Sequence, residues 1–204
     1  RFADAAKAHV MQAATYLIRD DASTFHTYYM DVATGAPRYG NTQQGYADDS
    51  CWSRGQAWGI YGFLLSYIYT GDETMIALSK RLANYFLNRL PEDYVCHWDL
   101  ALVGTDALRD SSSAAIAVCG LLELVKHLPV TDPDRERYLE WAKGIMSSLT
   151  KHYLMGKEEK GTGLLKHSVY HLASNKGVDE CASWGDYFYV EALVRFTQSW
   201  KLYW

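Results

Sequence analysis

The links between the helical segments of this sequence alternate between short turns and long polar loops. Apolar residues recur at a helical period in six segments, which we expect to be helices at residues 2–18, 52–69, 73–89, 111–127, 133–152 and 184–201. Short links at 70–72 and 128–132 alternate with long aromatic loops at 91–109 and 156–179. This alternation is typical of a toroid of helical hairpins, with short links on one face and functional loops on the other.

The helix count predicts an incomplete ring. Six helices would make half of a double ring of twelve, and an open half-ring would expose an apolar inner face. We therefore expect part of the domain to precede Arg1. No linker or low-complexity segment divides residues 1–204, so they are expected to belong to one domain.

Short polar residues mark most of the expected helix starts. The N-caps that we expect are Asp72, Asp110, Asp132, either Ser50 or Ser53, and the capping-box pair Ser183 and Asp186. Before the second helix, the β-branched and aromatic run Thr24–Met30 predicts a strand. The Gly-rich stretch that follows at 37–45 makes a short hairpin the expected structure here.

Composition excludes several classes of function. The net charge is −4, so nothing electrostatic favours nucleic acid or an anionic membrane surface. No apolar run approaches the ~20 residues of a membrane span. The four cysteines show no CxxC spacing and are interpreted as buried or free thiols, not as a zinc site or a disulfide framework.

Residues Asp48–Trp58 combine two carboxylates, an arginine, an amide and two tryptophans at the start of a helix. A helix N-terminus favours an anionic ligand, and the planar fork of Arg54 suits a carboxylate or sulfate. Trp52 and Trp58 could form two flat walls of one pocket. The alternative is that both tryptophans pack in the core and that Arg54 pairs with Asp48 or Asp49.

The segment Ser53–Gly62, SRGQAWGIYG, closely resembles a signature of the unsaturated glucuronyl hydrolases, glycoside hydrolase family 88. The other stretches that agree are 25–27, 44–46, 98–99, 110–115, 177–180 and 184–188. The similarity covers essentially the whole chain, in order. The neighbouring unsaturated rhamnogalacturonyl hydrolases usually read Arg-Gly-Asn-Gly-Trp here, so Gln56 and Ala57 argue against that group.

This resemblance implies an all-α fold, an (α/α)6 barrel, of which the chain would be the C-terminal portion and about half of the toroid. It also implies a hydrolase that acts on unsaturated uronyl oligosaccharides, the products of lyases that cut glycosaminoglycans. In this reaction an aspartic acid protonates C4 of the C4=C5 double bond, water adds at C5, and the hemiketal collapses to release the neighbouring sugar. No metal and no organic cofactor is expected.

Site residues follow from the same resemblance. His26, Gln44 and Arg54 would line the subsite for the unsaturated uronate and assist catalysis. Trp52 and Trp58 would shape the pocket and stack on the adjoining sugar.

A family loop that resembles Ser-x-x-Ser-x-Lys recognises a sulfated unit, and its positions here are His171, Ser174 and Lys176. We expect these three residues to bind substrate. The first serine is replaced by His171, which puts a preference for sulfated substrate in question.

The chain departs from the family in one major respect, because no aspartate matches the principal acid, which we expect upstream. The carboxylates near the motifs, expected to cap helices or support the site, are Asp48, Asp49, Asp99 and Asp110. Two alternatives therefore stay open. One is an unsaturated rhamnogalacturonyl or galacturonyl hydrolase, and the other is a non-catalytic carbohydrate-binding helical domain.

The expected partner is an oligosaccharide that ends in an unsaturated uronate. Neither nucleic acid nor membrane is expected as a partner. The sequence leaves open whether the protein is a monomer or a homodimer and whether it is cytoplasmic or periplasmic.

Overall fold

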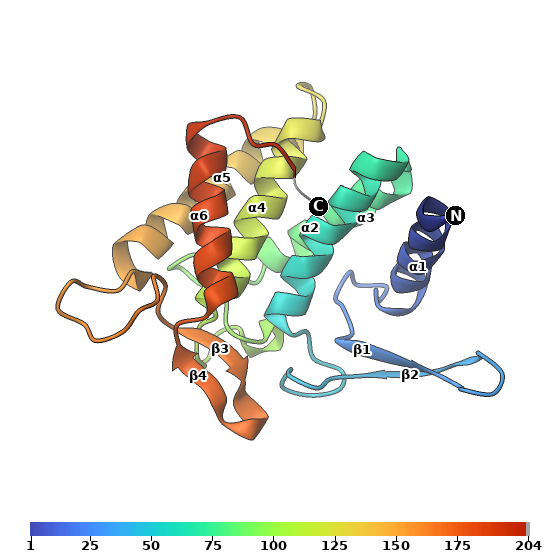
Figure 1. Cartoon of the computed structure of the whole chain (residues 1–204), viewed down its shortest axis with the longest axis horizontal. Coiled ribbons are helices and arrows are strands. Elements are labelled where there is room, and N and C mark those ends of the chain that lie inside the picture. Colours follow the sequence, from blue (N-terminus) through green and yellow to red (C-terminus); the bar gives the residue numbers. More distant parts are fainter. Residues whose placement is uncertain (203–204) are drawn as a thin grey trace.

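A computed structural model describes residues 1–202, which form six α-helices and two β-hairpins (Figure 1). The helices are α1 (Phe2–Tyr16), α2 (Ser53–Thr70), α3 (Glu73–Leu87), α4 (Ser111–His127), α5 (Pro133–Ser148) and α6 (Ser183–Thr197). The strands are β1 (Thr27–Met30), β2 (Pro37–Asn41), β3 (Ser168–His171) and β4 (Lys176–Glu180). All six predicted helices are confirmed, with ends that differ by a few residues. Within the described residues, no helix has the length and apolar character to cross a membrane.

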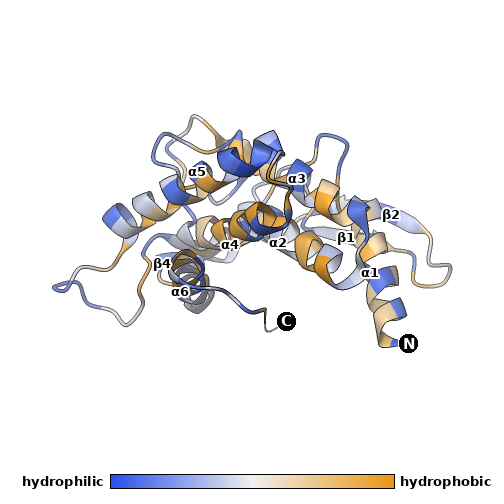
Figure 2. Ribbon diagram, turned by 90° about the horizontal axis from the view of Figure 1, so that it is seen from above, coloured by the Kyte–Doolittle hydropathy of each residue, from blue (hydrophilic) through white to orange (hydrophobic). Residues whose placement is uncertain are grey.

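Alternate helices form two rows. Helices α2, α4 and α6 make one row with α4 in the middle, while α3 packs on α2 and α5 packs on α4. Seen from above in Figure 2, α6, α4 and α2 follow an arc, and α5 and α3 lie along the upper side of that arc in the view. The chain is therefore part of an α/α toroid. Both hairpins lie at one end of the row, and the short α2–α3 link lies at the opposite end (Figure 1), as the alternation of link lengths predicts.

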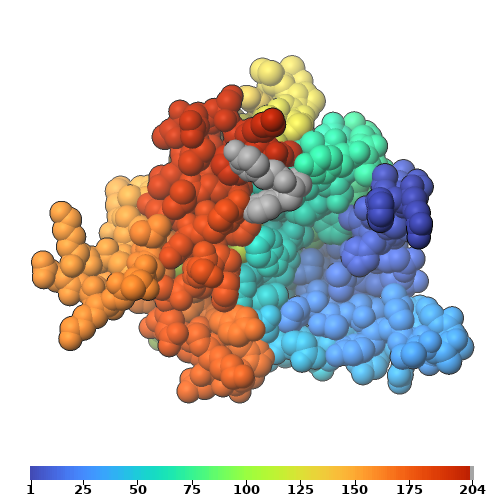
Figure 3. All heavy atoms as spheres, in the orientation of Figure 1, coloured from blue at the N-terminus to red at the C-terminus, as the bar shows by residue number. Residues whose placement is uncertain are grey.

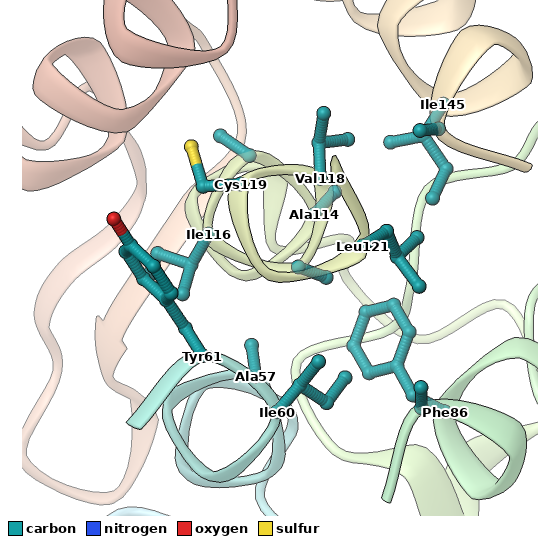
Figure 4. Close-up of a cluster of buried hydrophobic side chains, with 14 of the residues drawn as sticks. Ala57, Ile60, Tyr61, Phe86, Ala114, Ile116, Val118, Cys119, Leu121 and Ile145 are labelled. Atoms are coloured by element: carbon teal, nitrogen blue, oxygen red, sulfur yellow. The ribbon is translucent and has the colours of Figure 1, made fainter. Parts of the chain in front are cut away.

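Helix α4 is the centre of the core, since every residue from Ser111 to Leu121 is buried. Side chains of α2, α3 and α5 pack around it (Figure 4). Ile60 projects from α2, Phe86 from α3 and Ile145 from α5, and all three are fully buried. Alanines on α4 keep this helix thin, so that its neighbours approach closely. The core thereby fixes the N-terminal ends of α2 and α4, which carry the candidate site.

Gly120 lies at a close approach of α2 and α4. A Cβ atom at Gly120 would lie 2.8 Å from Cγ2 of Ile60 and 3.2 Å from the backbone nitrogen of Tyr61. We expect Gly120→Ala to lower the free energy of unfolding by about 1–3 kcal/mol, because the core is overpacked. Gly62→Ala on α2 is the matched control. Its Cβ would have no neighbour within 4 Å, and it should stabilise the helix by about 0.5–1 kcal/mol. Urea unfolding of both variants checks this, and equal effects would contradict the close approach.

Three of the expected helix caps are confirmed. Asp72, Asp110 and Asp132 each accept a backbone N–H at the start of their helix.

The expected caps of α2 and α6 are wrong, because tertiary contacts occupy their side chains. Ser50 Oγ donates to Asp99 and Ser53 Oγ donates to the Trp98 carbonyl, so no side chain caps α2. The pair Ser183 and Asp186 forms no capping box. The carboxylate of Asp186 instead accepts the N–H groups of residues 164 and 165.

The predicted β1–β2 hairpin is confirmed, but the second long loop is not entirely a loop. Strands β3 and β4 pair antiparallel, with Val169 opposite Val178 and His171 opposite Lys176. Asn175, at φ 50°, makes the left-handed turn between them. Glycines and polar residues hide this hairpin in the sequence, because its alternation is only four or five residues long on each side.

The two helices at the ends of the arc, α6 and α1, have exposed surface. Along α6, Tyr187, Val190, Leu193 and Phe196 are each 37–45% exposed at a spacing of three residues. No residue of α1 is buried. Figure 3 shows the face on which α6 and α1 flank α2.

Candidate active site

The two hairpins meet at the N-terminal end of α2. Gln44, after β2, donates from Nε2 to the carbonyl of Tyr170 in β3 at 2.5 Å. In the opposite direction, His171 Nε2 contacts the carbonyl of Gln43 at 2.5 Å. Arg54, in the first turn of α2, donates to the carbonyls of Val169 and Tyr170 at 2.9 and 3.0 Å. Segments more than one hundred residues apart in sequence therefore form one site.

Arg54 is the most enclosed of the predicted site residues, with a side chain only 4% exposed. Its Nη1 donates to Asp110 Oδ2 at 2.6 Å. The guanidinium lies 4.5 Å from the Trp52 ring centroid and 5.3 Å from that of Trp184. The alternative pairing of Arg54 with Asp48 or Asp49 is wrong, because the start of α4 lies closer to it than that loop does.

His26 is held in one orientation by the loop after β2. Its Nδ1 accepts the backbone N–H groups of Gln43 and Gln44 at 3.0 and 3.1 Å, and its ring lies 4.3 Å from that of Trp52. Since Nδ1 accepts, we assign the neutral ring's proton to Nε2. Burial lowers the pKa of His26, and the positive charge of Arg54 lowers it further. A neutral ring whose Nε2–H is available suits hydrogen bonding to sugar hydroxyls.

The lowered pKa of His26 predicts how stability depends on pH. The unfolded chain takes up this proton first, near its ordinary value of 6.5, so the contribution is fully present above that pH and is lost as pH falls through the lower, folded-state pKa. Protonating Nδ1 also removes an acceptor from two backbone N–H groups. We expect urea unfolding to show a smaller loss of stability between about pH 7 and pH 5 in His26→Gln than in the wild type. The control is His152→Gln, because His152 is exposed. This variant should lose as much stability between about pH 7 and pH 5 as the wild type does.

Trp52 and Trp58 line one groove of about 620 Å³ between α1 and α2, together with His26. The prediction that both indoles face the same pocket is confirmed. They differ in exposure, since Trp52 is 7% and Trp58 39% exposed. Trp58 packs its ring against Phe188 of α6 at 5.1 Å. The groove volume is typical of small-molecule sites.

The three residues of the expected recognition loop occupy the tip of the β3–β4 hairpin. His171 ends β3, Lys176 begins β4 opposite it, and Ser174 lies in the turn. His171 Nδ1 contacts the hydroxyl of Ser174. The hydroxyl of Ser174 is therefore engaged by His171 within the protein.

Three of the four carboxylates expected to cap helices or support the site have such contacts. Both oxygens of Asp99 accept hydrogen bonds, from the N–H groups of residues 46, 51 and 101 and from Ser50. Asp110 caps α4 and binds Arg54. Asp48 accepts the N–H of Thr42, while Asp49 is exposed. Among residues 1–202, no carboxylate lines the groove, and no three His, Cys, Asp or Glu side chains are grouped to hold a metal ion.

Trp184 is a site residue that the sequence reasoning missed. Its ring flanks Arg54, and its Nε1 donates to Ser112 Oγ at 3.0 Å. The dipeptide Trp-Gly occurs near the starts of both α2 and α6 and draws attention to Trp184. It indicates an internal repeat, and it does not predict the contact with Arg54.

His97 and Trp98, on the long loop before α4, are buried at 2% and 5% exposure. The four cysteines are free. This agrees with the interpretation as buried or free thiols, since three are buried and Cys181 is exposed.

Known proteins resemble this chain along nearly its whole length, although no protein-family profile matches it. It is 50% identical over 205 residues to the unsaturated chondroitin disaccharide hydrolase of Streptococcus pneumoniae, covering 100% of this chain and 52% of that protein. It is 40% identical over 200 residues to the unsaturated glucuronyl hydrolase of Bacillus sp. strain GL1, covering 98% and 53%. The chain spans about half the length of the curated relatives it matches.

Solved structures agree in fold over the same extent. The crystal structure of the Bacillus sp. GL1 enzyme superposes with a TM-score of 0.93 at 39% identity, covering 97% of this chain and 52% of that one. A mutant unsaturated glucuronyl hydrolase from Streptococcus agalactiae, complexed with dGlcA-GalNAc6S, superposes with a TM-score of 0.90 at 50% identity. That match covers 98% of this chain and 54% of the other.

Proposed function

We propose that this chain, which matches about half of an unsaturated glucuronyl hydrolase in sequence and fold, supplies the uronate-binding half of such an enzyme's active site. The reaction is hydration of the C4=C5 double bond of a terminal unsaturated uronate, followed by release of the neighbouring sugar. One observation carries the proposal. His26, Gln44 and Arg54 come from separate segments and are brought together at the N-terminal end of α2, where His26 accepts the Gln44 N–H and both Gln44 and Arg54 donate to the Tyr170 carbonyl.

The chemistry of these groups suits an unsaturated uronate. His26 Nε2–H donates to a hydroxyl, and Arg54, whose charge is paired with Asp110, offers polar contact to the uronate. Trp58, whose ring is 39% exposed, provides an apolar face for the adjoining sugar. The reaction is general acid catalysis by a tuned carboxylic acid, and it differs from displacement at the anomeric carbon.

The proton donor in this proposal lies outside the 204 residues, in the rest of a single (α/α)6 barrel of which this chain is the C-terminal portion. Both oxygens of Asp99 and of Asp110 are already engaged as acceptors. The exposed apolar stripe of α6 and the unburied α1 are the surfaces that the remaining helices cover.

The substrate in this proposal is an unsaturated disaccharide released from a glycosaminoglycan. Lys176 supplies an exposed cation at the hairpin tip, whereas the Ser174 hydroxyl is engaged by His171. We therefore expect the wild type to hydrolyse sulfated and unsulfated chondroitin disaccharides with similar kcat/KM. The His171→Ser variant frees the Ser174 hydroxyl, so the ratio of kcat/KM for the two disaccharides should be larger in that variant. Equal ratios for the two proteins would contradict this role of His171.

The test follows the ultraviolet absorbance of the conjugated uronate, which hydration abolishes. Two proteins are compared, the 204-residue chain and the same chain joined to the half of the Streptococcus pneumoniae relative that it does not match. Loss of absorbance in the joined protein alone supports the proposal. Loss in the short chain would place the acid within it, and no loss in either would refute the hydrolase proposal.

A second candidate function is a non-catalytic carbohydrate-binding domain. The observation that favours it is the absence of a carboxylate from the groove lining within the described residues. Binding of the disaccharide by the joined protein without any loss of absorbance would support it.

A further inference from the structure

We propose that Asp110 is a positioning residue for Arg54, in addition to the N-cap of α4. This inference rests on the proposed function, since it names how one residue of that site is held. Asp110 is fully buried, and it lies 56 positions from Arg54 in the sequence.

The two oxygens of Asp110 have different tasks. Oδ1 accepts the backbone N–H groups of Ser112 and Ser113 at 3.1 and 3.4 Å, which is the capping contact. Oδ2 accepts from Arg54 Nη1 at 2.6 Å and from Ser113 Oγ at 2.9 Å. Capping needs a single acceptor oxygen, and asparagine caps as well as aspartate. The negative charge of Asp110 is therefore needed for Arg54, not for the helix.

Arg54 depends on this charge because its other recorded acceptors are neutral. They are the carbonyls of Val169 and Tyr170 and the hydroxyl of Ser112. A guanidinium that is 4% exposed is costly to bury unless a carboxylate pairs with it. Without Asp110, Arg54 is expected to leave its position between the two indole rings and turn toward solvent.

Asp99 is a matched control. It is also fully buried, and it also caps a helical turn, Leu100–Leu102. Among residues 1–202, the groups that donate hydrogen bonds to Asp99 are backbone N–H groups and the Ser50 hydroxyl only. Replacing Asp99 removes a buried carboxylate of the same kind without touching Arg54.

The first experiment observes Arg54 directly, by NMR of arginine side-chain N–H groups in the 204-residue chain. The Arg54 signal is assigned with Arg54→Lys. We expect slowly exchanging Nη resonances for Arg54 in the wild type and in Asp99→Asn, and their loss in Asp110→Asn. An unchanged Arg54 signal in Asp110→Asn would overturn the proposal. This measurement does not depend on enzymatic activity.

The second experiment measures kinetics in the joined protein described above. Asp110→Asn is expected to raise KM about 10- to 100-fold with a smaller change in kcat, because a misplaced binding group weakens substrate positioning. In an Arg54→Lys background the same substitution should have little further effect on KM. If the two substitutions raise KM by factors that multiply in the double variant, Asp110 acts independently of Arg54. An inactive wild type would refute the proposed function and leave the NMR result to decide this inference.

Asp110→Asn could also fail to fold because it leaves Arg54 buried without a counter-charge. The double variant Arg54→Leu with Asp110→Asn removes both charges. Recovery of folding in the double variant would show that the loss acts through Arg54. A double variant as unstable as Asp110→Asn would overturn the proposal.

Discussion

Replacing Arg195 with methionine should lower the free energy of unfolding by about 3–5 kcal/mol, because it leaves the buried carboxylate of Glu191 without its counter-charge and removes one from Glu123. Arg195 on α6 pairs with Glu123 of α4 and with Glu191, and it also donates to the hydroxyl of Tyr61 on α2. The side chains of both glutamates are at most 1% exposed. Burial opposes ionisation of Glu123, yet the hydrogen bond and charge of Arg195 hold its pKa below the ordinary value.

Urea unfolding of the 204-residue chain measures the effect, and Arg137→Met is the matched control. Arg137 also forms an ion pair, with Asp134 at 3.1 Å, but its side chain is 45% exposed. Solvent screens such a pair, so we expect a change of no more than about 1 kcal/mol. Similar losses in the two variants would mean that Arg195 does not connect the three helices of the row.

Trp52→Ala should destabilise the chain by about 3–5 kcal/mol, the range for a large aromatic side chain lost from a core. Trp52 is 7% exposed, and its ring contacts both His26 and Arg54. Trp58→Ala should cost less than half as much, because Trp58 is 39% exposed. Its loss should instead weaken disaccharide binding by the joined protein.

Urea unfolding and a binding titration on the same two variants separate these effects. A larger stability loss in Trp58→Ala would reverse the assignment of Trp52 as the structural wall of the groove. Unchanged binding in Trp58→Ala would remove it from the site.

Local sequence predicts most of the fold, because its signals act over a few residues. Helical periodicity placed all six helices, and Asp72, Asp110 and Asp132 marked three of their starts. An N-cap needs only the N–H groups two or three residues further on, so it can be predicted without knowledge of the fold. The alternation of link lengths predicted the two faces in the same way, since a short link forces neighbouring helices to lie antiparallel.

Tertiary contacts decided what the same residue types do elsewhere. Ser50 and Ser53 are good cap residues in isolation, but their hydroxyls donate instead to Asp99 and to the Trp98 carbonyl. The β3–β4 hairpin was missed for a related reason. Its strands are too short to signal themselves, and they are held by Arg54 from a distant helix.

The sequence by itself predicted that His26, Gln44 and Arg54 share one site, because the resemblance to a known family rests on local motifs that carry these residues. Only the tertiary structure decided which carboxylate faces Arg54. The nearest aspartates in sequence, Asp48 and Asp49, lie in a surface loop, whereas Asp110 is 56 residues away. Packing of α2 against α4 brings the N-terminal ends of these two helices together, and a charge buried there must pair with the carboxylate that the packing places beside it.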